Sequence, residues 1–169
     1  IEEIIIGCEP FMLTPNRAGK EVSSFVDTQF LHVYVAAVAA YHGDKAGPFW
    51  QLPSTYNDPR IKELMKKVKL VLHPRAEELL AGKTKAGQAP RFRNVIVEVT
   101  AKGKKFTGEV EAARRMLNPI SDEELKAKFR NNASYSPLKV EKVEECLKML
   151  YKLEMIDDVT KLFNLLTVG

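Results

Sequence analysis

Apolar and polar residues along this chain follow two different periods, which predict strands in some segments and helices in others. Ile1 to Gly7 is an isoleucine-rich run typical of a buried strand. From Ser23 to Tyr41 the pattern becomes helical, because Phe30, Tyr34 and Val38 recur at the spacing of one helix face. The sequence therefore predicts an early strand followed by a long amphipathic helix.

The middle of the chain contains a helix start and a hairpin. Asn57-Asp58-Pro59 places an acidic cap before a proline at the first helical position. A short strand over Lys69 to Leu72 follows this helix. Two alternating segments, Phe92 to Thr100 and Lys105 to Glu111, are joined by Ala101-Lys102-Gly103-Lys104, which predicts a β-hairpin.

The last third of the chain is helical in pattern. Ser121 followed by Glu124 is a capping box that opens a helix, and further helices are predicted from Ser136 and from Ile156. Strands and helices do not alternate strictly along the whole chain. We therefore expect an α+β fold, with a small mixed sheet, a β-hairpin and packed helices in residues 1–134, and an all-helical segment in residues 135–169.

Composition and charge narrow the functional classes. The chain is 45% hydrophobic and 28% charged, which is typical of a globular protein. Its most apolar run, Val33 to Tyr41, is about half the ~20 residues that a membrane helix needs, so no membrane span is expected. The net charge of +4 permits an anionic ligand. Nucleic-acid binding is not expected, because the lysines are spread out; the alternative would use the loop and hairpin lysines, Lys83, Lys85, Lys102, Lys104 and Lys105.

Common catalytic motifs are absent from the sequence. Gly82-Lys83-Thr84 resembles the end of a phosphate-binding loop, but the upstream glycine and the preceding strand are missing. The three histidines have no carboxylate or cysteine at ligand spacing, so we expect no metal site. Cys8 and Cys146 lie in apolar surroundings and are interpreted as two buried free thiols in a reducing compartment.

Tyr34 is the residue to which the pattern draws attention. It follows Asp27 and Phe30 on the same predicted helix and precedes an alanine-rich run. In one interpretation it is a core tyrosine with its hydroxyl satisfied. In the other, its phenol donates a proton near a substrate carboxylate or a carbon acid.

Four segments of the chain resemble one family in the same order. They are Asp27-x-x-Phe30-x-x-x-Tyr34 with the following Val-Ala-Ala-Val-Ala, the helix-then-strand segment Asn57 to Leu70, the stretch Asn118 to Ser134, and the closing Leu153 to Asp158. Together they resemble the 2-methylcitrate dehydratase (MmgE/PrpD) family, which also includes cis-aconitate decarboxylase and iminodisuccinate epimerase.

The resemblance implies a two-domain enzyme whose active site lies in a cleft between a helical domain and an α+β lid. Residues 1–134 would be the lid-type domain, and residues 135–169 would pack back on a helical domain that this chain does not contain. The predicted strand begins at Ile1, and together with the resemblance this early strand suggests that the chain is the C-terminal part of a longer enzyme. We expect the chain alone to be inactive. The implied enzyme is a dehydratase, a lyase that acts on a small di- or tricarboxylic acid by proton abstraction and elimination.

Further expectations follow from the same resemblance. The family's active-site tyrosine corresponds to Tyr34, and neither a cofactor nor a metal is implied. A homodimer is expected, in the cytoplasm or, in a eukaryote, in the mitochondrial matrix. Decarboxylation and epimerisation are the alternative reactions.

The sequence also departs from the family pattern. Ala112 to Leu117 replaces a Pro-x-Gly stretch, and Leu31, His32 and Val33 replace small or polar residues before the tyrosine. His32 is a candidate substrate-binding residue, or else a partly exposed helix histidine. An alternative of a different class is an α+β binding or dimerisation module without catalysis.

Overall fold

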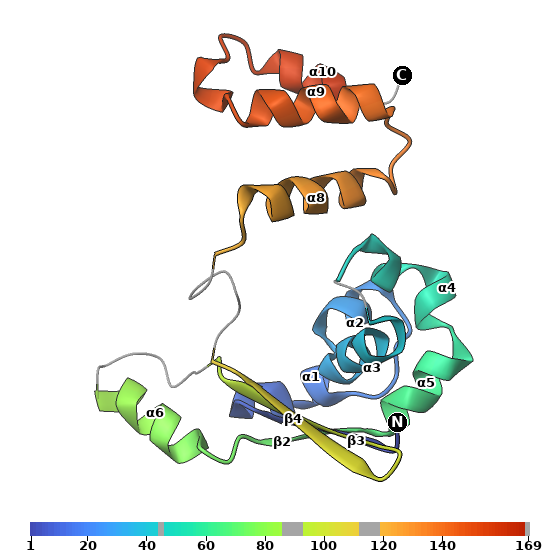
Figure 1. Ribbon diagram of the computed structural model, residues 1–169, viewed down its shortest axis with the longest axis vertical. Coiled ribbons are helices and arrows are strands. Elements are labelled where there is room, and N and C mark those ends of the chain that lie inside the picture. Colours follow the sequence, from blue (N-terminus) through green and yellow to red (C-terminus); the bar gives the residue numbers. More distant parts are fainter. Residues whose placement is uncertain (44–45, 86–92, 112–118, 168–169) are drawn as a thin grey trace. The chain divides into compact units, whose positions relative to one another are not determined.

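The computed structural model describes residues 1–43, 46–85, 93–111 and 119–167, which group into two compact units, residues 1–119 and residues 120–169 (Figure 1). The predicted division between residues 134 and 135 falls inside the second unit, between α8 (Asp122–Ala133) and α9 (Val140–Leu150). These two helices are joined by an ion pair in which Arg130 Nε donates to Glu144 Oε1 at 2.6 Å.

The described strands of the first unit form one four-stranded mixed sheet in the order β2-β1-β3-β4. The strands are β1 (Glu3–Cys8), β2 (Val68–Leu72), β3 (Val95–Ala101) and β4 (Lys104–Val110). β1 pairs with β2 in parallel and with β3 antiparallel, and β3 pairs antiparallel with β4. The α+β class, the mixed sheet and the predicted hairpin are therefore confirmed.

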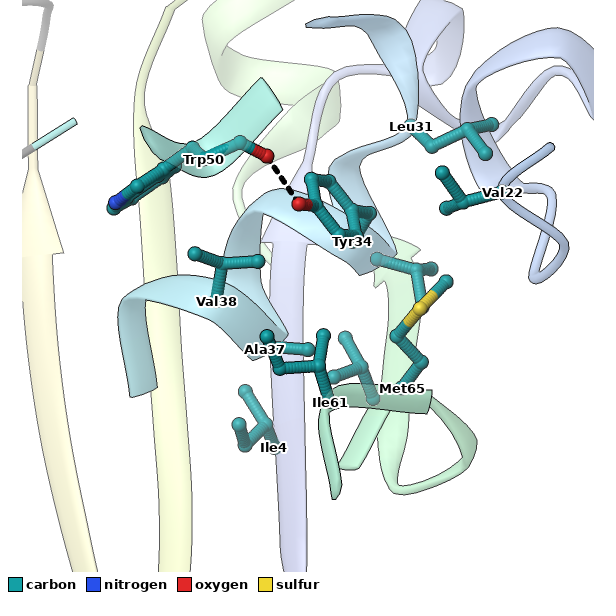
Figure 2. Close-up of a cluster of buried hydrophobic side chains, with 11 residues drawn as sticks. Ile4, Val22, Leu31, Tyr34, Ala37, Val38, Trp50, Ile61 and Met65 are labelled. Carbon is teal, nitrogen blue, oxygen red and sulfur yellow. Dashed lines mark hydrogen bonds between the residues drawn. The ribbon is translucent and has the colours of Figure 1, made fainter. Parts of the chain in front are cut away.

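The core lies between one face of this sheet and the helices α3 (His32–His42) and α5 (Pro59–Lys66) (Figure 1). Ile4 pairs with both Val68 and Val99, so a row of apolar side chains crosses three strands on the helix-facing side. Figure 2 shows how residues from both helices meet this row; they include Tyr34, Ala37, Val38, Ile61 and Met65. The opposite face carries ion pairs, Lys69 with Glu3 at 2.5 Å and Lys105 with Glu98 at 2.9 Å.

The long helix predicted from Ser23 to Tyr41 is in fact two helices. α2 (Phe25–Phe30) ends at Leu31, whose backbone is extended with ψ 105°, and α3 begins at the next residue. The break buries the Leu31 side chain, at 6% exposed, and leaves Phe30 42% exposed. An uninterrupted helix would bury Phe30, whereas the broken one buries Leu31, and the free energy gained by burying Leu31 offsets the burial of Phe30 that is lost.

Several shorter elements complete the described residues. They are η1 (Pro10–Leu13), α1 (Pro15–Ala18), η2 (Pro48–Gln51), α4 (Pro53–Tyr56), α6 (Ala76–Lys85), η3 (Leu153–Met155) and α10 (Thr160–Leu166). α6 continues through Gly82 as far as Lys85, so Gly82-Lys83-Thr84, which resembles the end of a phosphate-binding loop in sequence, is helical. One glycine costs a helix only about 1 kcal/mol, and no proline interrupts this stretch.

The turn of the hairpin requires two residues with positive φ, Lys102 at 51° and Gly103 at 69°. We expect Gly103→Ala to lower the free energy of unfolding of the 169-residue chain by about 1 kcal/mol, since only glycine adopts this region without steric cost. Gly108→Ala in β4 is the matched control, because its added Cβ meets nothing within 4 Å and its φ is not positive. Equal urea midpoints for the two variants would contradict this account of the turn.

Candidate functional site

Tyr34, the predicted catalytic residue, lies in the core of the first unit. α3 carries its side chain inward to 0% exposure, and its hydroxyl donates a hydrogen bond to the backbone carbonyl of Trp50 in η2 (Figure 2). Val22, Leu31 and Met65 belong to the same buried cluster. This is the position that the alternative interpretation, a core tyrosine with a satisfied hydroxyl, expects.

The surroundings of Tyr34 fix its protonation state. Burial, with a smaller contribution from Tyr56, raises the pKa of the Tyr34 phenol to about 12. The group is therefore neutral at physiological pH, and it acts as a hydrogen-bond or proton donor rather than as a base. The catalytic role of Tyr34 stays a prediction, and that role requires its hydroxyl to leave the Trp50 carbonyl.

A hollow of about 820 Å³ lies beside this core, formed by η1, α1, α2 and the segments that join them. Leu31 belongs both to its wall and to the buried cluster around Tyr34. The wall combines apolar side chains with cationic and polar ones: Phe11, Thr14, Pro15, Asn16, Arg17, Gly19, Lys20, Glu21, Val26, Asp27, Phe30 and Leu31.

Arg17 is the cation held most firmly in this hollow. Its guanidinium carbon lies 4.6 Å from the centroid of the Phe30 ring and 5.0 Å from that of Phe11. Two aromatic faces therefore fix the side chain from two elements. Among the described residues Arg17 forms no ion pair, so its planar set of donors is available to an anion such as a carboxylate.

The Asp27 carboxylate in the same hollow already accepts hydrogen bonds from neighbouring residues. Asp27 Oδ2 accepts hydrogen bonds from the backbone and hydroxyl groups of Ser23 and Ser24, at 2.9 to 3.0 Å, and so caps α2. These hydrogen bonds, led by the one from the Ser23 backbone, lower the pKa of Asp27. Asp27 is therefore a structural anion and a poor candidate for a general base.

His32, the predicted substrate-binding candidate, lies at the start of α3 with a partly buried ring. Its Nδ1 atom is buried and has no hydrogen-bond partner among the described residues. Burial lowers the pKa of the imidazole, while hydrogen bonding to the backbone of Arg17 opposes that shift. The ring thus lies against the backbone of the residue that carries the hollow's cation, although it does not line the hollow itself. Its role in substrate binding stays a prediction.

The lowered pKa of His32 predicts a dependence of stability on pH. The unfolded chain takes up a proton near pH 6.5, whereas the folded imidazole resists protonation, so stability is full above pH 6.5 and falls as the pH drops below it. We expect the thermal midpoint of the chain to fall between pH 7.5 and pH 5, and His32→Asn to flatten that fall. Identical profiles for the two proteins would contradict this interpretation.

Sequence analysis did not identify Arg17 or Phe11. Nothing in the pattern links them, because their partner Phe30 comes from a different element and only the fold brings the three side chains together. The described ranges contain no group of three or more His, Cys, Asp or Glu side chains able to hold a metal ion. In the same part of the chain, no helix is long and apolar enough to span a membrane.

The first unit is an α+β domain whose surface carries a hollow in which Arg17 lies between two aromatic rings. The chain belongs to the MmgE/PrpD family, since residues 1–150 match the MmgE/PrpD C-terminal domain. The matched region ends at the last residue of α9. No curated protein matches this chain.

Proposed function

We propose that this chain is the C-terminal, lid-type part of a lyase of the 2-methylcitrate dehydratase type. The observation that carries the proposal is the family match over residues 1–150. The hollow supports it, because a small di- or tricarboxylic acid needs a cation with fixed geometry, and Arg17 is such a group.

In the proposed reaction, Arg17 binds one carboxylate of the substrate and Lys20 contributes positive charge at the rim. A base outside this chain removes a proton from the carbon next to a carboxylate. The electron pair moves onto that carboxylate, and the nearby cations stabilise the charge that develops there. When the electrons return, they expel the hydroxyl group from the adjacent carbon as water.

Tyr34 is the proposed donor of the proton that leaves with this water. Its neutral state, with a pKa of about 12, supports this role. Its hydroxyl must first exchange the Trp50 carbonyl for the substrate. Leu31 lines the hollow and also belongs to the buried cluster around Tyr34, which supports approach of the substrate from the hollow.

Decarboxylation and epimerisation begin with related carbanion chemistry, so the product distinguishes them. We expect the full-length protein to form a carbon–carbon double bond from 2-methylcitrate or a related hydroxy acid, followed by ultraviolet absorbance. Release of CO₂ would assign a decarboxylase, and a new stereoisomer by chiral chromatography an epimerase. No turnover of any such acid would favour the non-catalytic binding module. The cytoplasmic or mitochondrial location stays a prediction.

A further inference from the structure

The short helix η2 holds the hydroxyl group that the proposed reaction needs. Its Trp50 carbonyl accepts the hydrogen bond from Tyr34, and Figure 2 shows the two groups facing each other. The Trp50 amide, in contrast, donates within the same stretch of chain, to the Gly47 carbonyl at 3.1 Å. Among the described residues, the Tyr34 hydroxyl makes the hydrogen bond that joins η2 to α3.

Tyr34 and η2 differ in how firmly the fold holds them. The Tyr34 side chain is 0% exposed and packs in the cluster that contains Leu31 and Met65, so its ring is fixed within α3. η2 is flanked by two residues with extended backbone, Gly47 and Leu52, and Leu52 is 39% exposed. A change in backbone angles at these two residues moves η2 without disturbing α3. We therefore expect the Trp50 carbonyl, and not the Tyr34 ring, to move when the hydrogen bond between them breaks.

The observed position of η2 leaves one polar group unsatisfied. Trp50 is 8% exposed, and its Nε1 atom is buried without a hydrogen-bond partner among the described residues. In Figure 2 this nitrogen lies at the end of the indole that points away from Tyr34. A buried donor without an acceptor destabilises the state that buries it, and exposure to water removes this cost. Loss of the Tyr34 hydrogen bond therefore favours a position of η2 in which the indole is exposed.

Aromatic contacts hold the other side of η2. The Phe49 ring lies edge-to-face with the Trp50 ring, at 6.1 Å between centroids, and with the ring of His42, the last residue of α3, at 5.2 Å. Edge-to-face pairs of this kind are favourable but modest in strength. They stabilise the observed position together with the Tyr34 hydrogen bond, and weakening either contact is expected to release the segment.

We propose that η2 is a latch that a bound hydroxy acid opens. The hydroxyl of the acid accepts the hydrogen bond from Tyr34, the Trp50 carbonyl loses its donor, and η2 moves away from α3. This inference rests on the proposed function, because it describes the regulation of the same site. A ligand shifts such an equilibrium only through a contact that it makes in one of the two states. Here that contact is the hydrogen bond from Tyr34, so an acid without a hydroxyl group binds Arg17 and leaves the latch closed.

Fluorine nuclear magnetic resonance of the full-length protein, labelled with 5-fluorotryptophan, tests the latch. The Trp50 signal is assigned by its loss in Trp50→Phe. We expect saturating 2-methylcitrate to make this signal sensitive to exchange of H₂O for D₂O, as an exposed indole is. Tricarballylate, which has the three carboxylates of citrate but no hydroxyl, is expected to leave it unchanged. Tyr34→Phe is expected to expose the indole without any acid, and the control Tyr41→Phe to behave as wild type.

Phe49→Ala provides a second test, because it weakens the closed position without touching Tyr34 or Arg17. The apparent affinity of a ligand rises with the fraction of protein already in the state that binds it. We therefore expect the dissociation constant of 2-methylcitrate, by titration calorimetry, to fall about two- to tenfold, the range that one aromatic pair contributes. The dissociation constant of tricarballylate is expected to stay the same. A segment with a purely structural role would give no selective gain in affinity.

The outcomes separate this inference from the proposed function. An equal response of the Trp50 signal to both acids, or none with bound 2-methylcitrate, would overturn the latch and leave the measured turnover in place. A buried Trp50 signal in Tyr34→Phe would overturn it as well. Absence of both binding and turnover for every acid tested would remove the proposed function, and the latch with it.

Discussion

Tyr34→Phe in the full-length protein is expected to lower kcat by about 10²–10⁴-fold, the usual contribution of one general acid. The same change removes the hydrogen bond to the Trp50 carbonyl and leaves a buried acceptor unsatisfied, so the free energy of unfolding is expected to fall by about 1–2 kcal/mol. Steady-state kinetics and urea unfolding of the same preparations measure both effects.

The two measurements separate catalysis from structure. Tyr41→Phe is the matched control, because Tyr41 lies on the same helix, is 39% exposed and keeps its ring beneath Arg60 as phenylalanine. It is expected to change neither quantity. If Tyr34→Phe loses stability but turns over at the wild-type rate, Tyr34 is a core residue that positions η2 and not a proton donor.

Arg17→Ala is expected to raise KM for a di- or tricarboxylic acid by about 10- to 100-fold, since a hydrogen bond to a charged group contributes about 1.5–3 kcal/mol. The effect on kcat is expected to be smaller, because the bound carboxylate is present in both the ground state and the transition state. Arg17→Lys is expected to fall between wild type and alanine, since lysine keeps the charge but not the planar set of donors.

A matched control is available elsewhere in the same unit. Arg60 also lies over an aromatic ring, 5.0 Å from the centroid of Tyr41, but it does not line the hollow and it pairs with Asp58. Arg60→Ala therefore removes an equivalent stacked cation without touching the proposed site, and KM is expected to stay unchanged. Equal KM values for Arg17→Ala and Arg60→Ala would remove the hollow from the proposed site.

Much of the fold could be predicted because its signals are local. The hairpin depends on alternation and on Lys102-Gly103, and the helix after Asp58 depends on a cap whose carboxylate accepts from the Arg60 amide at 2.8 Å. The break at Leu31 could not be predicted, because it depends on the burial of that side chain among residues distant in sequence. Local propensity contains no information about such contacts.

In the candidate site, too, only the features with a local sequence signal could be predicted. Tyr34 was identified from a helical stripe and a family resemblance, but its burial and its bond to Trp50 depend on the fold of residues 47–52 against α3. Arg17 has no local signal, because two rings from separate elements hold it in place. Functional geometry that is assembled from several elements is visible only in three dimensions.

The proposed reaction begins with removal of a proton from a carbon next to a carboxylate. The most direct test incubates the full-length protein with 2-methylcitrate, citrate or cis-aconitate in D₂O and follows the carbon-bound protons by nuclear magnetic resonance. We expect enzyme-dependent loss of the proton signal at that carbon, by formation of the alkene or by exchange with solvent, and we expect Arg17→Ala and Tyr34→Phe to slow this loss. An unchanged proton signal at that carbon in every acid tested, with a folded full-length protein, would contradict the proposed proton abstraction.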